Sequence, residues 1–408
     1  MKSHRSAGSR AFAALLGLGL FVSCGVLVAQ TQTAPRFKFD ADWPKPLPNK
    51  WKLGGVTGLA IDKDDNVWLL NRISDLRDLE LHAETNPPTA ACCVAPPSMI
   101  HIDKAGNVIG SFDAGDGHGM AVDSNGFIYI GQDTVRKFDP ATGKVVAEVP
   151  RAPEAPPGAG GGRAAAPRTP GRGGAGPVGT VAFPNRGNPP APTAIAAYRA
   201  KYPPTTPMIV GGIEEVRLDE PARELYAADN YLGGRVMIFD LDTFAFKRGW
   251  GAYGKPLSDM TVNDADRAYT PGGPMPKEFR GHLTLNISND GLIYAADRAA
   301  NRIQVTTKEG KFIKEFVLSP ETGEGGSTGG VAFSADKQQR HLYISDITNS
   351  HVWFLNRSDG KVLGQFGTMS QNGGQFMGLH MIAVDSKGNI YTGEVWNGER
   401  VQRFVPGR

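Results

Sequence analysis

Short apolar runs separated by polar turns recur along most of the chain. One unit reads Met120-Ala-Val122, then the turn Asp123-Ser-Asn-Gly126, then Phe127-Ile-Tyr-Ile130, and then a third expected strand, Val135-Arg-Lys-Phe138. Runs of this length, bounded by Gly, Asp and Asn, predict antiparallel strands joined by tight turns. No helical period competes with the pattern, so it indicates an all-β protein.

The same unit occurs six times, and each copy supplies about four strands. Four-stranded units repeated in this way are typical of a β-propeller. The sixth copy supplies only three strands, and Arg36-Phe-Lys-Phe39 is well placed to add the fourth and remove an exposed edge. We therefore expect a six-bladed β-propeller whose ring is closed by an N-terminal strand. The innermost strands of the six copies begin near Val56, Met120, Glu214, His282, Val331 and Met381.

Two segments depart from the repeat. Residues 1–29 join Lys2, Arg5 and Arg10 to an apolar run, the pattern of a secretory signal peptide cleaved after Ala29. The propeller is then expected over 30–408. Residues 151–207 are rich in Gly, Pro, Ala and Arg, a composition that cannot bury enough surface to become ordered. We expect a disordered insertion there, between the second and third blades.

The N-terminal pattern also predicts the location of the protein, which is secreted or periplasmic. Phe21-Val-Ser-Cys24 is a poor lipidation motif because its first position is usually Leu, so a lipoprotein anchored at Cys24 is the less favoured alternative. No other stretch reaches the roughly 20 apolar residues that span a bilayer. We expect no stable membrane insertion after cleavage.

The net charge of the chain limits the partners that it can bind by electrostatic attraction. The chain has 44 basic and 41 acidic residues, and residues 1–29 contain three bases and no acid, which leaves 41 of each. A neutral protein offers no electrostatic basis for binding nucleic acid. We expect a monomer that takes a small-molecule or peptide substrate. Cys92 and Cys93 are neighbours that rarely fit disulfide geometry, so two free thiols are expected and a vicinal disulfide is the alternative.

Three of the eight histidines take one position in alternate copies. His118 and His380 each lie five residues before the aspartate that begins the turn, and His282 holds the matching position in the fourth copy. Alternate blades of a six-bladed ring are about 120° apart, so these side chains should converge on the axis. Three imidazoles with an open position form a catalytic zinc site, and the same set accepts Co, Fe or Cu. The other copies carry Thr57, Glu214 and Gly329 at this position.

Two arginines and a tyrosine are expected beside these histidines. The second strand of a blade ends where the antiparallel first strand begins. Arg72 and Arg298 occupy that end in the first and fourth copies, and Tyr231 stands one residue further on in the third. Arginine suits bidentate carboxylate binding. A tyrosine near a metal and an arginine can have its pKa lowered enough to act as a base. The alternative for each residue alone is a solvated or hydrogen-bonded rim side chain.

These residues carry a resemblance to a known family. Ala121-Val-Asp-Ser-Asn-Gly-Phe-Ile-Tyr129 resembles NHL-type propellers in general. The propeller as a whole resembles peptidyl-alpha-hydroxyglycine alpha-amidating lyases. Met381 stands where that family has an aspartate that helps to hold calcium, and the family's disulfides are missing, so structural calcium is not favoured. The segments that resemble the family's active-site regions are 53–72, 118–123, 229–239, 280–282, 296–304 and 379–380.

The resemblance implies a metal-dependent lyase that cleaves the C–N bond of an alpha-hydroxyglycine amide, giving a primary amide and glyoxylate. It implies zinc on His118, His282 and His380, with Tyr231 as the base and two active-site arginines. One alternative is a non-catalytic NHL propeller that binds peptide, protein or glycan on the same rim. A lactonase-like hydrolase ranks last, because such enzymes hold calcium with carboxylate and Asn ligands rather than histidines.

Overall fold

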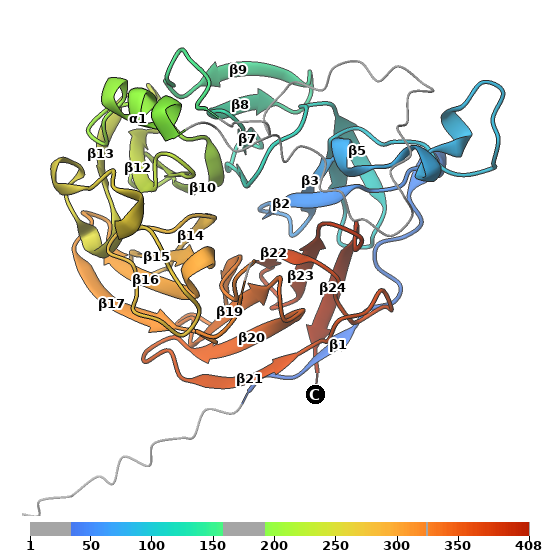
Figure 1. Ribbon diagram of the computed structural model, residues 1–408. Coiled ribbons are helices and arrows are strands. Elements are labelled where there is room, and N and C mark those ends of the chain that lie inside the picture. Colours follow the sequence, from blue (N-terminus) through green and yellow to red (C-terminus); the bar gives the residue numbers. More distant parts are fainter. Residues whose placement is uncertain (1–33, 158–191, 324, 408) are drawn as a thin grey trace, which may run out of the picture. The chain divides into compact units, whose positions relative to one another are not determined.

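Six four-stranded sheets stand in a ring, each a meander of strands that follow one another in sequence (Figure 1). The computed structural model describes residues 34–157, 192–323 and 325–407. All strand pairs within the sheets are antiparallel, and the first strand of each sheet lies nearest the centre of the ring. The predicted all-β, six-bladed propeller is confirmed.

The strands follow the predicted units closely. Blade one contains β2 (Gly55–Ile61), β3 (Val67–Arg72), β4 (Met99–Ile102) and β5 (Val108–Phe112). Blade two contains β6 (Met120–Val122), β7 (Ile128–Gly131), β8 (Val135–Asp139) and β9 (Lys144–Glu148). Blade three contains β10 (Ile213–Asp219), β11 (Glu224–Asp229), β12 (Arg235–Asp240) and β13 (Phe246–Trp250). Blade four contains β14 (Leu283–Ile287), β15 (Leu292–Asp297), β16 (Arg302–Thr307) and β17 (Phe312–Val317).

Blade five contains β18 (Val331–Phe333), β19 (His341–Asp346), β20 (His351–Asn356) and β21 (Val362–Phe366). Blade six contains β22 (Leu379–Val384), β23 (Ile390–Glu394), β24 (Val401–Pro406) and β1 (Phe37–Phe39). Single 3-10 turns lie at Pro48–Lys50, Ile73–Asp75, Asp78–Glu80, His82–Glu84, Ala252–Gly254, Leu257–Asp259, Asp264–Asp266 and Arg298–Ala300.

The ring is closed by the N-terminal strand, as predicted. β1 pairs with β24, with Phe37 opposite Pro406 and Phe39 opposite Phe404. The Phe37 ring packs against Phe354 of blade five at a centroid distance of 5.6 Å. The closing strand therefore completes one sheet and joins it to its neighbour, so the sixth blade has no unpaired edge at β24.

The core lies between neighbouring blades. Apolar side chains alternate along the strands, so each sheet offers a face to the blade on either side. Between blades two and three, for example, fully buried Tyr129 packs in one cluster with Val216 and Leu225. Burial of a side chain of this kind contributes about 1.5–3 kcal/mol. This packing holds the inner strands in a ring around a central channel.

The ends of the predicted disordered insertion are ordered. Helix α1 (Pro192–Lys201) and residues 151–157 belong to the structure, and the Tyr198 hydroxyl donates to the carbonyl oxygen of Val210 at 2.8 Å. Tyr198 is 6% exposed and packs with Ala152 and Val210. The boundaries 151–207 were therefore wrong: one buried tyrosine supplies the apolar anchor that the Gly/Pro composition obscured. The middle of the insertion and the predicted signal segment 1–29 lie outside the described residues.

Two further expectations concern the neighbouring cysteines and membrane insertion. The structure joins Cys92 and Cys93 in a vicinal disulfide rather than leaving two thiols, in the connection between β3 and β4. Among the described residues, α1 is the longest helix and none is long and apolar enough to cross a membrane.

Candidate metal and catalytic site

Three of the predicted residues and one unexpected carboxylate meet at the channel. The Nε2 atoms of His118 and His380 lie 2.8 Å apart, although the residues are 262 positions apart in sequence. Glu214 Oε1 lies 3.4 Å from His118 Nε2 and 3.2 Å from His282 Nδ1. The ligand atoms of His118, Glu214 and His380 all lie within 4.8 Å of one another. His282 reaches this group through Glu214.

Glu214 was missed as a site residue, although its position was identified. It takes the register of the three histidines in the third copy, between His118 and His282 along the chain. The prediction from the sequence was limited to histidines and therefore passed over Glu214. Carboxylate oxygens commonly bind metals together with imidazoles, so a mixed set of ligands would have included it. Its side chain is 2% exposed, so its charge is compensated by neighbours rather than by water.

Local backbone irregularities aim these side chains inward. The register of β2, β10 and β22 shifts by one residue, and the extra residues are Thr57, Glu214 and His380. An extra residue in one strand bends the strand and redirects its side chain. His118 and His282 instead lie just before β6 and β14, and His282 has a left-handed φ of 55°. Bulges and strand starts thus supply the same inward position in different blades.

Hydrogen bonding prepares His118 to bind a metal. Its Nδ1 lies 2.7 Å from the carbonyl oxygen of Glu214, and a carbonyl can only accept, so Nδ1 carries the hydrogen. Burial lowers the pKa of the His118 ring, although Glu214 acts in the opposite direction. The ring is therefore neutral, and the lone pair of Nε2 points toward His380 and the Glu214 carboxylate. A lone pair held against a carboxylate oxygen fits a cation between them.

His380 has the same character. Burial lowers its pKa well below the ordinary value, and the neighbouring His118 and Arg298 lower it further. The ring is 5% exposed, and its Nδ1 is a buried atom with no hydrogen-bond partner. Two neutral imidazoles and one carboxylate fit a divalent transition metal. Burial by itself raises the pKa of Glu214, but His118 and His282 hold it well below its usual range.

Tyr231 lies over this group from blade three. Its ring meets the His282 ring edge-on at 5.9 Å, and the residue keeps 55% of its surface exposed. The negative charge of Glu214, followed by burial of the hydroxyl, raises the pKa of Tyr231, while Arg298 and Arg72 lower it. The sequence led us to expect a lowered pKa. The difference arises from Glu214, which the expectation did not include.

The two predicted arginines differ in how fully their guanidinium groups are already hydrogen-bonded. Arg298 is 7% exposed, interacts with Glu214 and Tyr231, and its Nε has no hydrogen-bond partner. Arg72 is paired with Asp75, with Nε–Oδ1 and Nη2–Oδ2 distances of 2.8 Å each. Arg298 is therefore the stronger candidate to bind a substrate carboxylate, and Arg72 lies beside it as an additional positive charge.

A repeated acid–arginine pair holds the loops of blades three, four and six. An acid ends the second strand, an arginine stands at the start of the third or one residue before it, and the arginine Nε donates to the acid at 2.7–3.0 Å. The acids also accept from backbone amides just before the innermost strands. These are the blades that carry Glu214, His282 and His380. The pairs are Asp229–Arg235, Asp297–Arg302 and Glu394–Arg400.

In each pair the arginine also fixes the chain that leads into the innermost strand. Arg235 donates to the carbonyl oxygens of Thr206 at 3.0 Å and Met208 at 2.6 Å. Arg302 donates to Pro276 and Glu278 at 2.9 Å and 2.8 Å in the same way. The acid and the arginine thus connect the rim loop to the residues just before the innermost strand, which carries or directly follows the site residue.

This arrangement makes the buried pairs essential to stability. Replacing Arg235 with leucine should lower the free energy of unfolding by about 3–5 kcal/mol, because fully buried Asp229 would lose its partner. Urea unfolding followed by tryptophan fluorescence measures the change. Arg223→Leu is the matched control, because its ion pair with Asp242 is exposed and its loss should change little. Equal effects of the two substitutions would contradict the role given to the buried pair.

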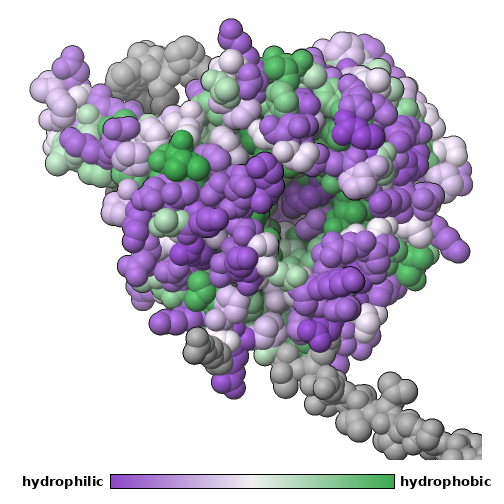
Figure 2. All heavy atoms as spheres, turned by 180° about the vertical axis from the view of Figure 1, so that it is seen from behind, coloured by the Kyte–Doolittle hydropathy of each residue, from purple (hydrophilic) through white to green (hydrophobic). Residues whose placement is uncertain are grey.

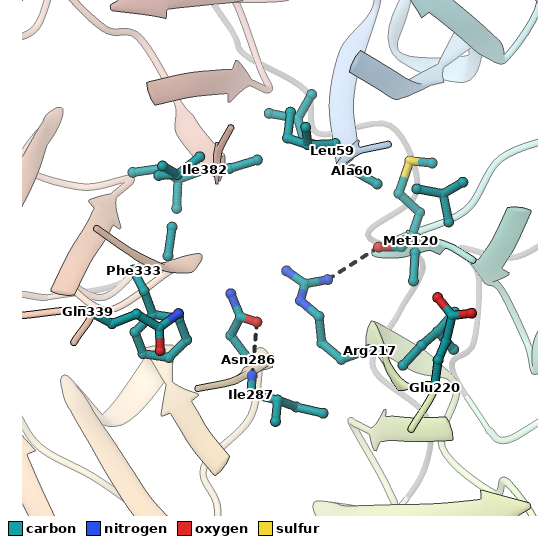
Figure 3. Close-up of a pocket in the computed structure, with 17 residues that line it drawn as sticks. Leu59, Ala60, Met120, Arg217, Glu220, Asn286, Ile287, Phe333, Gln339 and Ile382 are labelled. Atoms are coloured by element: carbon teal, nitrogen blue, oxygen red, sulfur yellow. Dashed lines mark hydrogen bonds between the residues drawn. The ribbon is translucent and has the colours of Figure 1, made fainter. Parts of the chain in front are cut away.

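The far half of the channel forms a separate cavity of about 340 Å³. Seen from the side opposite to Figure 1, the centre of the ring is hollowed (Figure 2). Figure 3 shows Arg217 reaching into this cavity, where its Nη1 donates to the Met120 carbonyl at 3.2 Å. Arg217 also pairs with buried Glu215, whose pKa is raised by burial to about 7. The cavity is lined by the later residues of the innermost strands, and the histidine–glutamate group lies at their beginning.

Comparison with known proteins agrees with the fold. No known family profile matches the sequence, and no curated protein matches it. Among solved structures, a crystal structure of a Bacteroides thetaiotaomicron protein of unknown function is similar, with a TM-score of 0.50 at 14% identity. The alignment covers 91% of this chain and 72% of the other. At this identity the likeness shows the fold alone.

Proposed function

We propose that this chain is a metal-dependent lyase that cleaves the C–N bond of an alpha-hydroxyglycine-type amide to a primary amide and glyoxylate. The observation that carries the proposal is the lone pair of His118 Nε2, held between His380 Nε2 at 2.8 Å and Glu214 Oε1 at 3.4 Å. Tyr231 and Arg298 stand beside this group. The resemblance of the same segments to the NHL-type amidating lyases supports this reading.

His118, His380 and Glu214 are the residues best placed to hold the metal, and His282 is the third imidazole at its edge. A bound divalent metal would supply Lewis acidity toward a substrate oxygen. The His118 ring is held by a hydrogen bond from Nδ1 to the Glu214 carbonyl, made on the side away from Nε2. Such outer hydrogen bonds orient a ligand and raise its basicity.

The remaining residues match the other demands of the reaction. The substrate hydroxyl loses its proton, its C–O bond becomes the aldehyde C=O, and the C–N bond breaks as nitrogen gains a proton. Atoms and charge balance without an oxidant or water. Arg298 binds the substrate carboxylate, with Arg72 adding positive charge, and Tyr231 accepts the hydroxyl proton.

Glu214 links metal binding to the state of Tyr231. Its negative charge is the largest cause that raises the pKa of Tyr231. A cation that neutralises this carboxylate removes that cause, so that Arg298 and Arg72, which favour the phenolate, are opposed only by burial of the hydroxyl. The base is therefore expected to act only in the metal-loaded protein.

The test combines metal analysis with glyoxylate release. Protein purified without chelator should contain one equivalent of a divalent transition metal and release glyoxylate from alpha-hydroxyhippurate. Chelation should abolish release, and added zinc should restore it. Protein without stoichiometric metal, and without glyoxylate release after zinc is added, would contradict the proposal and favour a propeller that binds peptide, protein or glycan on this rim.

A further inference from the structure

The rim loop of blade six repeats that of blade three. Blade three reads Asp229-Asn-Tyr231-Leu-Gly-Gly-Arg235, and blade six reads Glu394-Val-Trp396-Asn-Gly-Glu-Arg400. In both loops an aromatic residue follows the acid by two positions, and the acid is paired with the arginine six positions later. Trp396 is therefore the counterpart of Tyr231.

The two aromatic residues share an unusual backbone conformation. Tyr231 has a φ of 49° and Trp396 a φ of 56°, in the left-handed region that bulky side chains rarely adopt. This conformation is costly and persists only where the surroundings impose it, often at functional sites. Here the buried acid–arginine pair beneath each loop imposes it. Two blades of the protein therefore accept the energetic cost of this conformation, and each holds an aromatic ring at the same position.

The Trp396 ring lies against the chain that leads to His380. A Cβ atom built on Gly378 would lie 3.3 Å from Trp396 Cε3, and Gly378 stands two residues before His380. Trp396 also keeps 39% of its surface exposed. Blades three and six face each other across the ring (Figure 1), and Tyr231 and Trp396 stand in the corresponding rim loops of these two blades.

We propose that Trp396 is a specificity-determining residue that packs against the acyl group on the nitrogen of the substrate. With the hydroxyl at Tyr231 and the carboxylate at Arg298, the acyl group extends away from blade three, toward blade six. An indole offers a large, rigid apolar surface that favours aromatic and apolar groups. This inference rests on the proposed function for the orientation of the substrate, and it names the preferred class: amides with an aromatic or large apolar acyl group.

Binding of two stable analogues tests this inference without catalysis. Hippurate and N-acetylglycine both carry the glycine carboxylate, and they differ in a benzoyl against an acetyl group. Calorimetric titration of the zinc-loaded protein should give roughly tenfold tighter binding of hippurate, the size expected for one aromatic contact. Trp396→Ala should bring the ratio of the two dissociation constants close to one. Trp396→Phe should keep most of the preference.

Ile109→Ala is the matched control, because Ile109 is an exposed apolar residue on the outer strand β5 and its loss should leave the ratio unchanged. Equal affinities in the unsubstituted protein, no binding of either compound, or an unchanged ratio in Trp396→Ala would overturn the role of Trp396. Failure of the lyase proposal has a different signature: zinc-loaded protein that binds hippurate selectively but releases no glyoxylate from alpha-hydroxyhippurate.

Discussion

Replacing Tyr231 with phenylalanine should lower kcat for glyoxylate release by roughly 10²–10⁴-fold, the range that a positioned acid–base group contributes. The substitution removes only the hydroxyl, so the ring contact with His282 remains. Metal content should stay at one equivalent, because the substitution leaves His118, Glu214 and His380 unchanged. Steady-state kinetics with alpha-hydroxyhippurate, together with metal analysis of the same sample, measures both quantities.

Tyr202→Phe provides the control. Tyr202 packs beside Tyr198 at the ordered end of the insertion, with ring centroids 4.9 Å apart, and belongs to the cluster of Ala152 and Val210. Removing its hydroxyl should leave kcat unchanged. Full activity of the Tyr231→Phe protein would refute the assignment of Tyr231 as the base while leaving the metal site untouched.

Substitutions of the four candidate ligands should separate into two groups. His118→Ala and His380→Ala should abolish retention of the metal during dialysis, because each removes one of the two imidazoles whose Nε2 atoms meet. Glu214→Gln should also lose the metal, because it removes the negative charge of the carboxylate in the group. His282→Ala should weaken metal binding by roughly 10–100-fold, the cost of losing a group that supports the ligands. Competition with a chromogenic zinc chelator gives the dissociation constants.

The series also decides between two ligand sets. If His282→Ala loses the metal as completely as His118→Ala, the three imidazoles predicted from the sequence form the set. If Glu214→Gln loses it completely instead, two histidines and one carboxylate form the set. Retention of metal by both His118→Ala and His380→Ala would exclude a site at this position. His341→Ala is the control, since His341 begins β19, the second strand of blade five, and takes no part in the group.

The repeat made the fold predictable. Strand–turn–strand units have a local signature, and closure follows from counting strands, so the pairing of β1 with β24 was expected before any coordinates. Equivalent positions in the repeat occupy equivalent places in the ring, which is why His118 and His380 meet although they are 262 positions apart in sequence. The symmetry of the ring turned an alignment along the chain into an arrangement in space.

What the sequence did not reveal depends on contacts between different loops. The raised pKa of Tyr231 comes from Glu214, whose inward direction is set by a bulge in β10. The acid–arginine pairs are spaced five or six residues apart in a loop, a spacing that has no meaning until both residues are buried. Helix α1 was hidden by its Gly/Pro-rich surroundings, since one anchor such as Tyr198 hardly changes the composition of a long segment.

Closure by β1 has a consequence for the biosynthesis of the protein. The strand at residues 37–39 is made before every other strand of the ring, yet its partner β24 is made after them. The emerging chain must therefore keep the Phe37–Phe39 strand unpaired until all six blades have been made. The candidate ligands come from blades two, three, four and six. Under the proposed function, a metal would therefore be bound only after the ring has assembled, as a step that depends on the pairing of the two ends of the propeller.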